Sequence, residues 1–173
     1  MILQGRRKRR TKVENQDIYI EKNNVIFNYR VAVIIKNKDK ILVQKDNRTS
    51  HLTLPGGRCK LGESSNETAS REFFEETGIK TNFVRSLGII ENFFVSSFNQ
   101  KYYHEILIIN ELNFKNSNFY NNITINNIEE NKKNHIEYLW KSIDDLKAEN
   151  FRPKLIFNVL DKDYFVHLIN KEF

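Results

Sequence analysis

The sequence predicts a single α/β domain, on the strength of three observations. Two continuous apolar runs, at residues 31–35 and 106–109, are typical of strands that are buried on both faces of a sheet. Between them, residues 64–77 carry a helical pattern that begins with serine and is followed directly by glycine, as expected for a capped helix. The chain has 173 residues, which is enough for one domain with a sizeable core and short for two.

The net charge of +6 comes from one end of the chain. Residues 1–12 contain six basic residues and no acidic residue, and the remainder contains 22 basic and 22 acidic residues. The six are Arg6, Arg7, Lys8, Arg9, Arg10 and Lys12. We therefore expect residues 1–16 to form a solvated basic tail and residues 17–173 to form the domain, with nucleic acid not favoured as a partner. The alternative is a tail that attracts RNA or a polyphosphate.

The sequence also indicates the cellular compartment of the protein. No apolar run approaches the roughly 18 residues that a membrane-spanning helix needs, so we expect no membrane association. The basic N-terminus is not followed by the apolar stretch of a secretory signal. The single cysteine, Cys59, cannot form an internal disulfide, which favours a reducing compartment. We expect a cytoplasmic protein.

The first half of the domain is predicted to consist of short strands joined by turns. We expect strands at residues 17–22, 25–36, 41–45 and 51–54. The last of these should end at Pro55, Gly56 and Gly57, because proline removes a ladder donor and glycine lets the backbone approach a ligand closely.

A helix is predicted next. It begins at Ser64 or Ser65, either of which can cap the free N–H groups. Ala69, Phe73 and, on the far flank, Phe74 are expected to supply its buried side. Gly78 is expected to end the helix in the left-handed conformation.

The second half is predicted to return to strands and to end in helices. We expect one or two strands within 81–98 and single strands at 102–112 and 136–140. Helices are expected at 142–148, from Pro153 onward and within 161–173. Nine of the 22 residues from 113 to 134 are asparagine, a residue that favours turns over sheet ladders. We interpret 113–134 as a long loop near the site, with room for one short strand.

Three carboxylates stand out on the predicted helix. Glu72, Glu75 and Glu76 are spaced i, i+3 and i+4, which places them within roughly 100° of one another on one face. Like charges at this spacing repel by a few tenths of a kcal/mol per pair. Three such groups favour a site for a hard divalent cation, Mg²⁺ or Mn²⁺. A solvated acidic face is the alternative explanation of the same residues.

The segment from Gly57 to Ile79 resembles the Nudix box, G-x5-E-x7-R-E-U-x-E-E-x-G-U, where U is a bulky aliphatic residue. The matching residues are Gly57, Glu63, Arg71, Glu72, Glu75, Glu76, Gly78 and Ile79. The one departure is Phe73, an aromatic residue at an aliphatic position. Seven fixed residues at fixed spacing arise by chance about once in 10⁹ starts. The resemblance spans most of residues 25–150 and implies the Nudix fold, an α/β/α sandwich around a mixed β-sheet.

The resemblance also implies roles for the residues of the box. Glu72 and Glu76 are expected to be the main ligands of Mg²⁺ or Mn²⁺, with Glu75 as a third and the Gly57 carbonyl as a fourth. Arg71 is expected to hold these carboxylates in place through hydrogen bonds. Glu63 is expected to orient Arg71. The catalytic residues would be Glu72, Glu76 and Arg71.

Other roles remain open in the sequence. The general base is Glu72 within the box, or Glu105, Glu129 or Glu130 outside it, although the last two also fit solvated loop charges. Arg30 and Arg58 are candidate phosphate contacts, and Arg30 fits equally well as a strand-end arginine that reaches solvent. Glu105 and Glu130 are candidate substrate contacts.

The resemblance implies hydrolysis of a diphosphate in a nucleoside diphosphate derivative, such as ADP-ribose, a nucleotide sugar or a nucleoside triphosphate. Residues 95–97, where sub-families often carry proline or tyrosine, contain neither, so the sequence does not choose among these substrates. Two alternatives are a Nudix-like nucleotide sensor without turnover and an RNA 5′-end pyrophosphohydrolase. Many relatives are homodimers, and the strand at 17–22 is the segment that we expect at such an interface.

Overall fold

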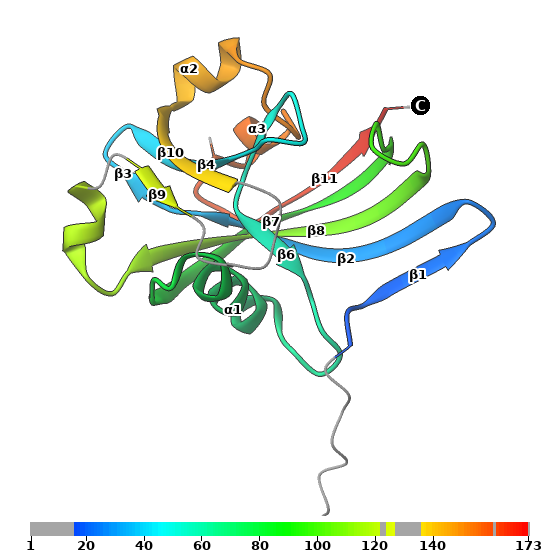
Figure 1. Ribbon diagram of the computed structural model, residues 1–173, viewed down its shortest axis with the longest axis horizontal. Helices are drawn as coiled ribbons and strands as arrows, with labels where there is room; N and C mark the ends of the chain where they lie inside the picture. The colour runs from blue at the N-terminus through cyan, green and yellow to red at the C-terminus, as the bar shows by residue number, and fades with distance from the viewer. Residues whose placement is uncertain (1–15, 122–123, 127–135, 161, 173) are drawn as a thin grey trace, which may run out of the picture.

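The computed structural model describes residues 16–121, 124–126, 136–160 and 162–172, which fold into two β-sheets and accompanying helices (Figure 1). The larger sheet contains β1 (Tyr19–Lys22), β2 (Val25–Ile34), β6 (Gly56–Arg58), β7 (Thr81–Val95), β8 (Tyr102–Phe114) and β11 (Val166–Lys171). The smaller sheet contains β3 (Lys36–Asn37), β4 (Lys40–Asp46), β5 (Leu52–Thr53), β9 (Thr124–Asn126) and β10 (Ile136–Ser142). The helices are α1 (Ser65–Thr77), α2 (Ile143–Ala148) and α3 (Ile156–Leu160), with a 3₁₀ turn η1 (Ser117–Asn121).

The larger sheet has the order β1-β2-β8-β7-β11, with β6 paired to β2, and it is mixed. β2 runs parallel to β8 and β11 runs parallel to β7, whereas β1–β2, β2–β6 and β7–β8 are antiparallel. Helix α1 lies on one side of this sheet and α2 and α3 lie on the other (Figure 1). Residues of the smaller sheet pack in the apolar clusters on both sides. Helices on both sides of a mixed sheet confirm the predicted fold class.

The apolar run of β2 is buried on both faces, as predicted. Val31 and Val33 pack in the same cluster as Phe73 of α1. Ala32 and Ile34 point the other way and join the cluster that includes residues of β4, α2 and α3. This alternation is the two-residue period of a strand, and it means that the two faces of the larger sheet have separate surroundings.

Helix α1 begins and ends where the sequence predicts. Ser64 is its N-cap, and the Ser64 N–H donates a hydrogen bond to the Glu67 carboxylate at 2.9 Å. Gly78 adopts the left-handed conformation, with φ of 70°, and its N–H donates to the Phe74 carbonyl. The prediction for the Phe74 side chain is wrong, because it is 44% exposed. It lies about 100° around the helix from buried Phe73.

The prediction of a helix within residues 161–173 is also wrong. β11 forms there instead and pairs in parallel with β7, from Val166 opposite Gly88 to Lys171 opposite Phe93. Its side chains alternate between half-buried and exposed, and Leu168 joins Val166 in packing against the core. That two-residue period is a strand pattern.

Other boundaries differ in smaller ways. α3 begins at Ile156, three residues after Pro153. The region 81–98 holds one strand, β7, in agreement with the one or two strands expected. The short strand that we expected in the asparagine-rich segment is β9, and residues 127–134 lie outside the described part. No helix among the described residues is long and apolar enough to cross a membrane.

Candidate active site

The strand β6 brings the start of the box against the larger sheet. Gly56 and Gly57 pair with Ala32 and Val31 of β2. A Cβ atom at Gly56 would lie 2.1 Å from the Val31 carbonyl oxygen, and one at Gly57 would lie 2.1 Å from the Glu72 carboxyl group. Only glycine therefore lets the Glu72 carboxylate of α1 lie against the backbone of β6.

Arg71 joins the loop before α1 to the carboxylates on the helix. Its Nε and Nη2 donate to the two oxygens of Glu63 at 2.7 and 2.8 Å. Its Nη1 donates to Glu72 at 2.6 Å and to Glu75 at 3.0 Å, while Nη2 also reaches the Arg58 carbonyl at 3.0 Å. One guanidinium thus fixes three carboxylates, and the geometry matches the positioning roles expected for Arg71 and Glu63.

The charges in this network stabilise one another. The hydrogen bonds from Arg71 to Glu63 raise the pKa of Arg71 above its ordinary value, with a further contribution from Glu72. Burial acts to raise the pKa of Glu63, but the hydrogen bonds from Arg71 and Thr68 outweigh it and hold that pKa below its ordinary value. Both side chains are therefore charged at neutral pH.

Glu76 is held separately from the other two helix carboxylates. The Tyr138 hydroxyl of β10 donates to Glu76 Oε2 at 2.5 Å. Glu76 lines a cavity of ≈ 410 Å³, together with Val31, Gly56 and Ile136. Glu72 and Glu75, by contrast, share the Nη1 of Arg71. In the described part of the chain, no three acidic, histidine or cysteine side chains are grouped as a ready-made metal site.

The donor set still fits a hard divalent cation. Glu72, Glu75 and Glu76 offer carboxylate oxygens, which Mg²⁺ and Mn²⁺ prefer. The backbone of Gly57 lies directly beside the Glu72 carboxylate, and the side chain of any larger residue at position 57 would collide with that carboxylate. A cation would have to draw the glutamates together, with Arg71 keeping Glu72 and Glu75 close to the required position.

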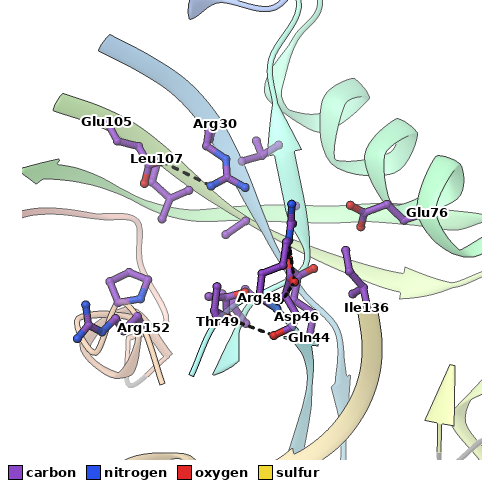
Figure 2. Close-up of a pocket in the computed structure, with 16 residues that line it drawn as sticks. Arg30, Gln44, Asp46, Arg48, Thr49, Glu76, Glu105, Leu107, Ile136 and Arg152 are labelled. Atoms are coloured by element: carbon purple, nitrogen blue, oxygen red, sulfur yellow. Dashed lines mark hydrogen bonds and ion pairs between the residues drawn. The ribbon is translucent and has the colours of Figure 1, made fainter. Parts of the chain in front are cut away.

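The cavity beside Glu76 is lined by three arginines from different parts of the chain: Arg30 of β2, Arg48 after β4 and Arg152 before α3. Figure 2 shows Glu76 entering the cavity from α1, with Glu105 on the opposite side and Arg30 near Glu105. Arg48 Nε donates to both carboxylate oxygens of Asp46, at 2.9 and 3.0 Å. Three carboxylates, those of Asp46, Glu76 and Glu105, line the same cavity. The guanidinium groups are nevertheless the donors there that suit an anionic ligand such as a phosphate.

The structure brings only some of the predicted substrate residues to this cavity. Arg30 and Glu105 line it, and their side chains pair at 3.7 Å. Arg58 lies elsewhere: its Nε donates to Asn28 at 3.0 Å and its guanidinium sits 4.8 Å from the centre of the Tyr19 ring. The remaining candidates, Glu129 and Glu130, lie outside the described residues.

Sequence reasoning did not find Arg48, Arg152 or Tyr138. All three come from segments far from the box, and each belongs to a residue type that is common on surfaces or in cores. Arg152 had one local signal, because it directly precedes Pro153 and such dipeptides are restricted to extended or turn conformations. That signal indicates a turn and does not indicate a ligand.

Comparisons with known proteins agree with the box. The model of the NUDIX domain family matches residues 27–159. A NUDIX hydrolase from Nitrosomonas europaea is 23% identical, with 78% of this chain and 86% of that chain covered and a TM-score of 0.54. A MutT protein from Bacillus halodurans is 21% identical, with 84% and 91% covered and a TM-score of 0.57.

An ADP-ribose pyrophosphatase from Streptococcus suis is 15% identical, with 83% of this chain and 98% of that chain covered and a TM-score of 0.54. At these identities the solved structures show that the fold is shared. The family match extends over most of the chain and includes the whole of the box. The chain therefore belongs to the Nudix family and is a Nudix hydrolase.

Proposed function

We propose that this protein hydrolyses the diphosphate bond of a nucleoside diphosphate linked to another group, with Mg²⁺ or Mn²⁺ held by Glu72, Glu75, Glu76 and the Gly57 carbonyl. The observation that carries the proposal is the shared cavity, in which Glu76 of the box and the arginines Arg30, Arg48 and Arg152 line the same space. The resemblance of the fold to an ADP-ribose pyrophosphatase supports a nucleoside diphosphate derivative as the substrate.

In this proposal, different residues of the chain have different roles in the reaction. A divalent cation supplies charge neutralisation on the diphosphate oxygens and lowers the pKa of a water molecule. Arg30, Arg48 and Arg152 bind the phosphate oxygens and favour the charge that develops as the bond breaks. Arg71 keeps Glu72 and Glu75 oriented. Among the candidate bases we propose Glu72 as the acceptor of the proton of the attacking water; its carboxylate lies against Gly57 of β6.

The test is a panel of ADP-ribose, nucleotide sugars and nucleoside triphosphates, incubated with Mg²⁺ or Mn²⁺ and analysed by product mass. We expect wild-type protein to cleave one class between its phosphorus atoms, and Glu76→Gln to reduce that turnover by at least 100-fold. Glu67→Gln is the matched control, because Gln preserves the capping box at the start of the same helix.

Two results would count against the proposal. Unchanged metal-dependent turnover in Glu76→Gln would show that the box does not carry the reaction. Tight binding of a panel member by wild-type protein, without any turnover, would instead identify a nucleotide sensor.

A further inference from the structure

Glu105 is a buried carboxylate on the side of the larger sheet that faces away from α1. It is 4% exposed. On β8, Leu107 and Ile109 share its side of the strand and pack in the cluster that includes residues of β4, α2 and α3. Leu112 lies on the opposite side, in the cluster with Phe73 of α1. Glu105 therefore lies on the opposite face of the sheet from the cluster that contains Phe73 of α1, although it lines the same cavity as Glu76 of the box.

The surroundings of Glu105 are built so that hydrogen-bond donors point at it. Asn28 Nδ2 lies 3.4 Å from Glu105 Oε2, and Asn92 Nδ2 lies 3.3 Å from Oε1. Each amide is oriented by a second donor, because Arg58 Nε donates to Asn28 Oδ1 at 3.0 Å and Asn170 Nδ2 donates to Asn92 Oδ1 at 2.6 Å. The arrangement holds the carboxylate at a fixed position.

The carboxylate retains capacity for a ligand. The two amide contacts are longer than the usual 2.7–3.2 Å of an N–H···O hydrogen bond, and the Arg30 guanidinium is 3.7 Å away. An ionised carboxylate has about four acceptor positions. Glu105 can therefore accept further hydrogen bonds from a ligand in the adjacent space.

Glu105 stands between two neighbouring cavities of different character. The cavity of ≈ 410 Å³ contains Glu76 of the box, and a second cavity of ≈ 250 Å³ is lined by Phe94 and Phe98. Arg30, Glu105 and Arg152 line both. Phe98 is 78% exposed and available to stack on a planar ring. From the first cavity to the second, the lining groups are Glu76, then Arg30 with Glu105, and then the aromatic rings of Phe94 and Phe98.

The register of the sheet gives the spacing. Gly57 pairs with Val31 of β2, and Glu105 of β8 pairs with Asn28 of the same strand. Three residues along a strand span about 10 Å. Glu105 is therefore farther from the proposed cation site than one hydrogen bond can reach. This distance favours a role in which Glu105 contacts a part of the substrate beyond the diphosphate. It does not favour proton transfer at the reacting phosphorus.

We propose that Glu105 accepts hydrogen bonds from the 2′ and 3′ hydroxyls of the substrate ribose, while the base stacks at Phe94 and Phe98. This inference rests on the proposed function for the position of the diphosphate. A carboxylate that receives two neighbouring hydroxyls discriminates strongly, because a substrate that lacks one of them leaves a buried acceptor unpaired. The protein should therefore prefer ribonucleotides to 2′-deoxyribonucleotides.

The test measures binding by calorimetry, using α,β-methylene-ADP and its 2′-deoxy counterpart, whose bridging group cannot be hydrolysed. Wild-type protein should bind the ribose form about 10- to 100-fold more tightly. Glu105→Gln should reduce this ratio to near one. Glu111→Gln is the matched control: it lies on the same strand and pairs with Arg85 and Lys36, and it should leave the ratio unchanged.

Equal binding of the two probes by wild-type protein would overturn the proposal, and so would an equal loss for both probes in Glu105→Gln. A preference that follows the base, seen by comparing α,β-methylene-ADP with its inosine analogue, would overturn the ribose assignment. If Glu105→Gln does not fold, Phe98→Ala replaces it and should weaken both probes equally. Because no turnover is needed, failure of the proposed hydrolysis would leave this binding result readable.

Discussion

At the scale of single residues, Arg71 is the group on which the arrangement of the box depends. Arg71→Ala should lower kcat/KM about 10- to 100-fold, because Glu72 and Glu75 lose the donor that positions them. It should also reduce the free energy of unfolding by about 1–3 kcal/mol, because Glu63 loses a two-point partner. Steady-state kinetics and urea denaturation measure the two effects.

Arg85→Ala is the control for Arg71. Arg85 also donates to a glutamate, Glu111, at 3.0 Å, but it lies on β7 and lines neither cavity of the proposed site. Its replacement should leave kcat/KM unchanged. Similar losses in the two variants would mean that Arg71 acts on overall stability and has no positioning role.

Tyr138 gives a second prediction at this scale. Tyr138→Phe keeps the buried ring but removes the hydroxyl that donates to Glu76 at 2.5 Å. A hydrogen bond to a charged group contributes about 1.5–3 kcal/mol, so kcat/KM should fall about tenfold or more if the contact persists in the transition state. Far-UV circular dichroism should be unchanged. Wild-type kcat/KM in this variant would show that the contact is unrelated to turnover.

The residues that could be predicted from the sequence are those of the box, since their spacing is local. Gly57, Glu63 and Arg71 all lie in one loop and the helix that follows it, so the contacts among these elements are formed within the 23 residues of the box. Tyr138 and Arg152 could not be predicted in this way. They reach the site only because β10 pairs with β4 and because the segment before α3 lies beside β5.

At the scale of elements, α1 depends on its termination at Gly78. Gly78 has φ of 70°, which costs a residue with a Cβ atom roughly 1–2 kcal/mol. Gly78→Ala should therefore lower the free energy of unfolding by about 1 kcal/mol. Gly78→Asn should cost less, because asparagine tolerates this conformation. Equal losses for Ala and Asn in urea denaturation would contradict the argument.

Glu63, in the loop before α1, should make the free energy of unfolding depend on pH. The pKa of Glu63 in the folded protein lies below the ordinary value of 4.5. The stability that this group contributes is therefore complete above its unfolded-state pKa, and it is lost as the pH falls through the lowered folded-state value. Glu63→Gln should flatten the acid side of the stability curve, measured as Tm between about pH 3 and 6. An unchanged curve would contradict the assignment.

The elements show how far local signals extend. The ends of α1 follow from Ser64 and Gly78, because capping acts within one turn of the helix. The prediction of a helix at the position of β11 is wrong because the strand forms by pairing with β7, which lies far away in the sequence. Val166, for example, pairs with Gly88, 78 positions earlier in the chain. Nothing near residues 166–171 reports on that pairing, so only the short alternation could have indicated a strand.

At the scale of the whole molecule, the division into two sheets decides where the substrate can lie. The sequence predicts strands that are buried on both faces, and β2 confirms this. It does not predict that a second sheet would pack in the apolar clusters on both sides of the first, since β4 and β10 pair across about 95 positions. That packing places Arg48 and Arg30 around one cavity, so the proposed phosphate-binding surface is a product of the topology.

The charge distribution of the whole chain yields the last prediction. All of the excess positive charge lies in residues 1–12, and the remainder has 22 basic and 22 acidic residues. In the proposed function a small diphosphate substrate contacts the arginines that line the cavity, so deletion of residues 1–12 should leave kcat/KM on such a substrate unchanged. An RNA substrate would instead be attracted by the six charges, and binding would weaken steeply with salt.

The deletion variant therefore separates two activities within the same family. It should match the full chain on small substrates at every salt concentration, and a 5′-triphosphorylated RNA should be a poor substrate for both proteins. If the full chain cleaves the RNA and the deletion removes both that turnover and its salt dependence, the RNA-directed alternative is correct. In that case the tail and the active site act on the same molecule, because a basic segment raises the local concentration of substrate and performs no chemistry itself.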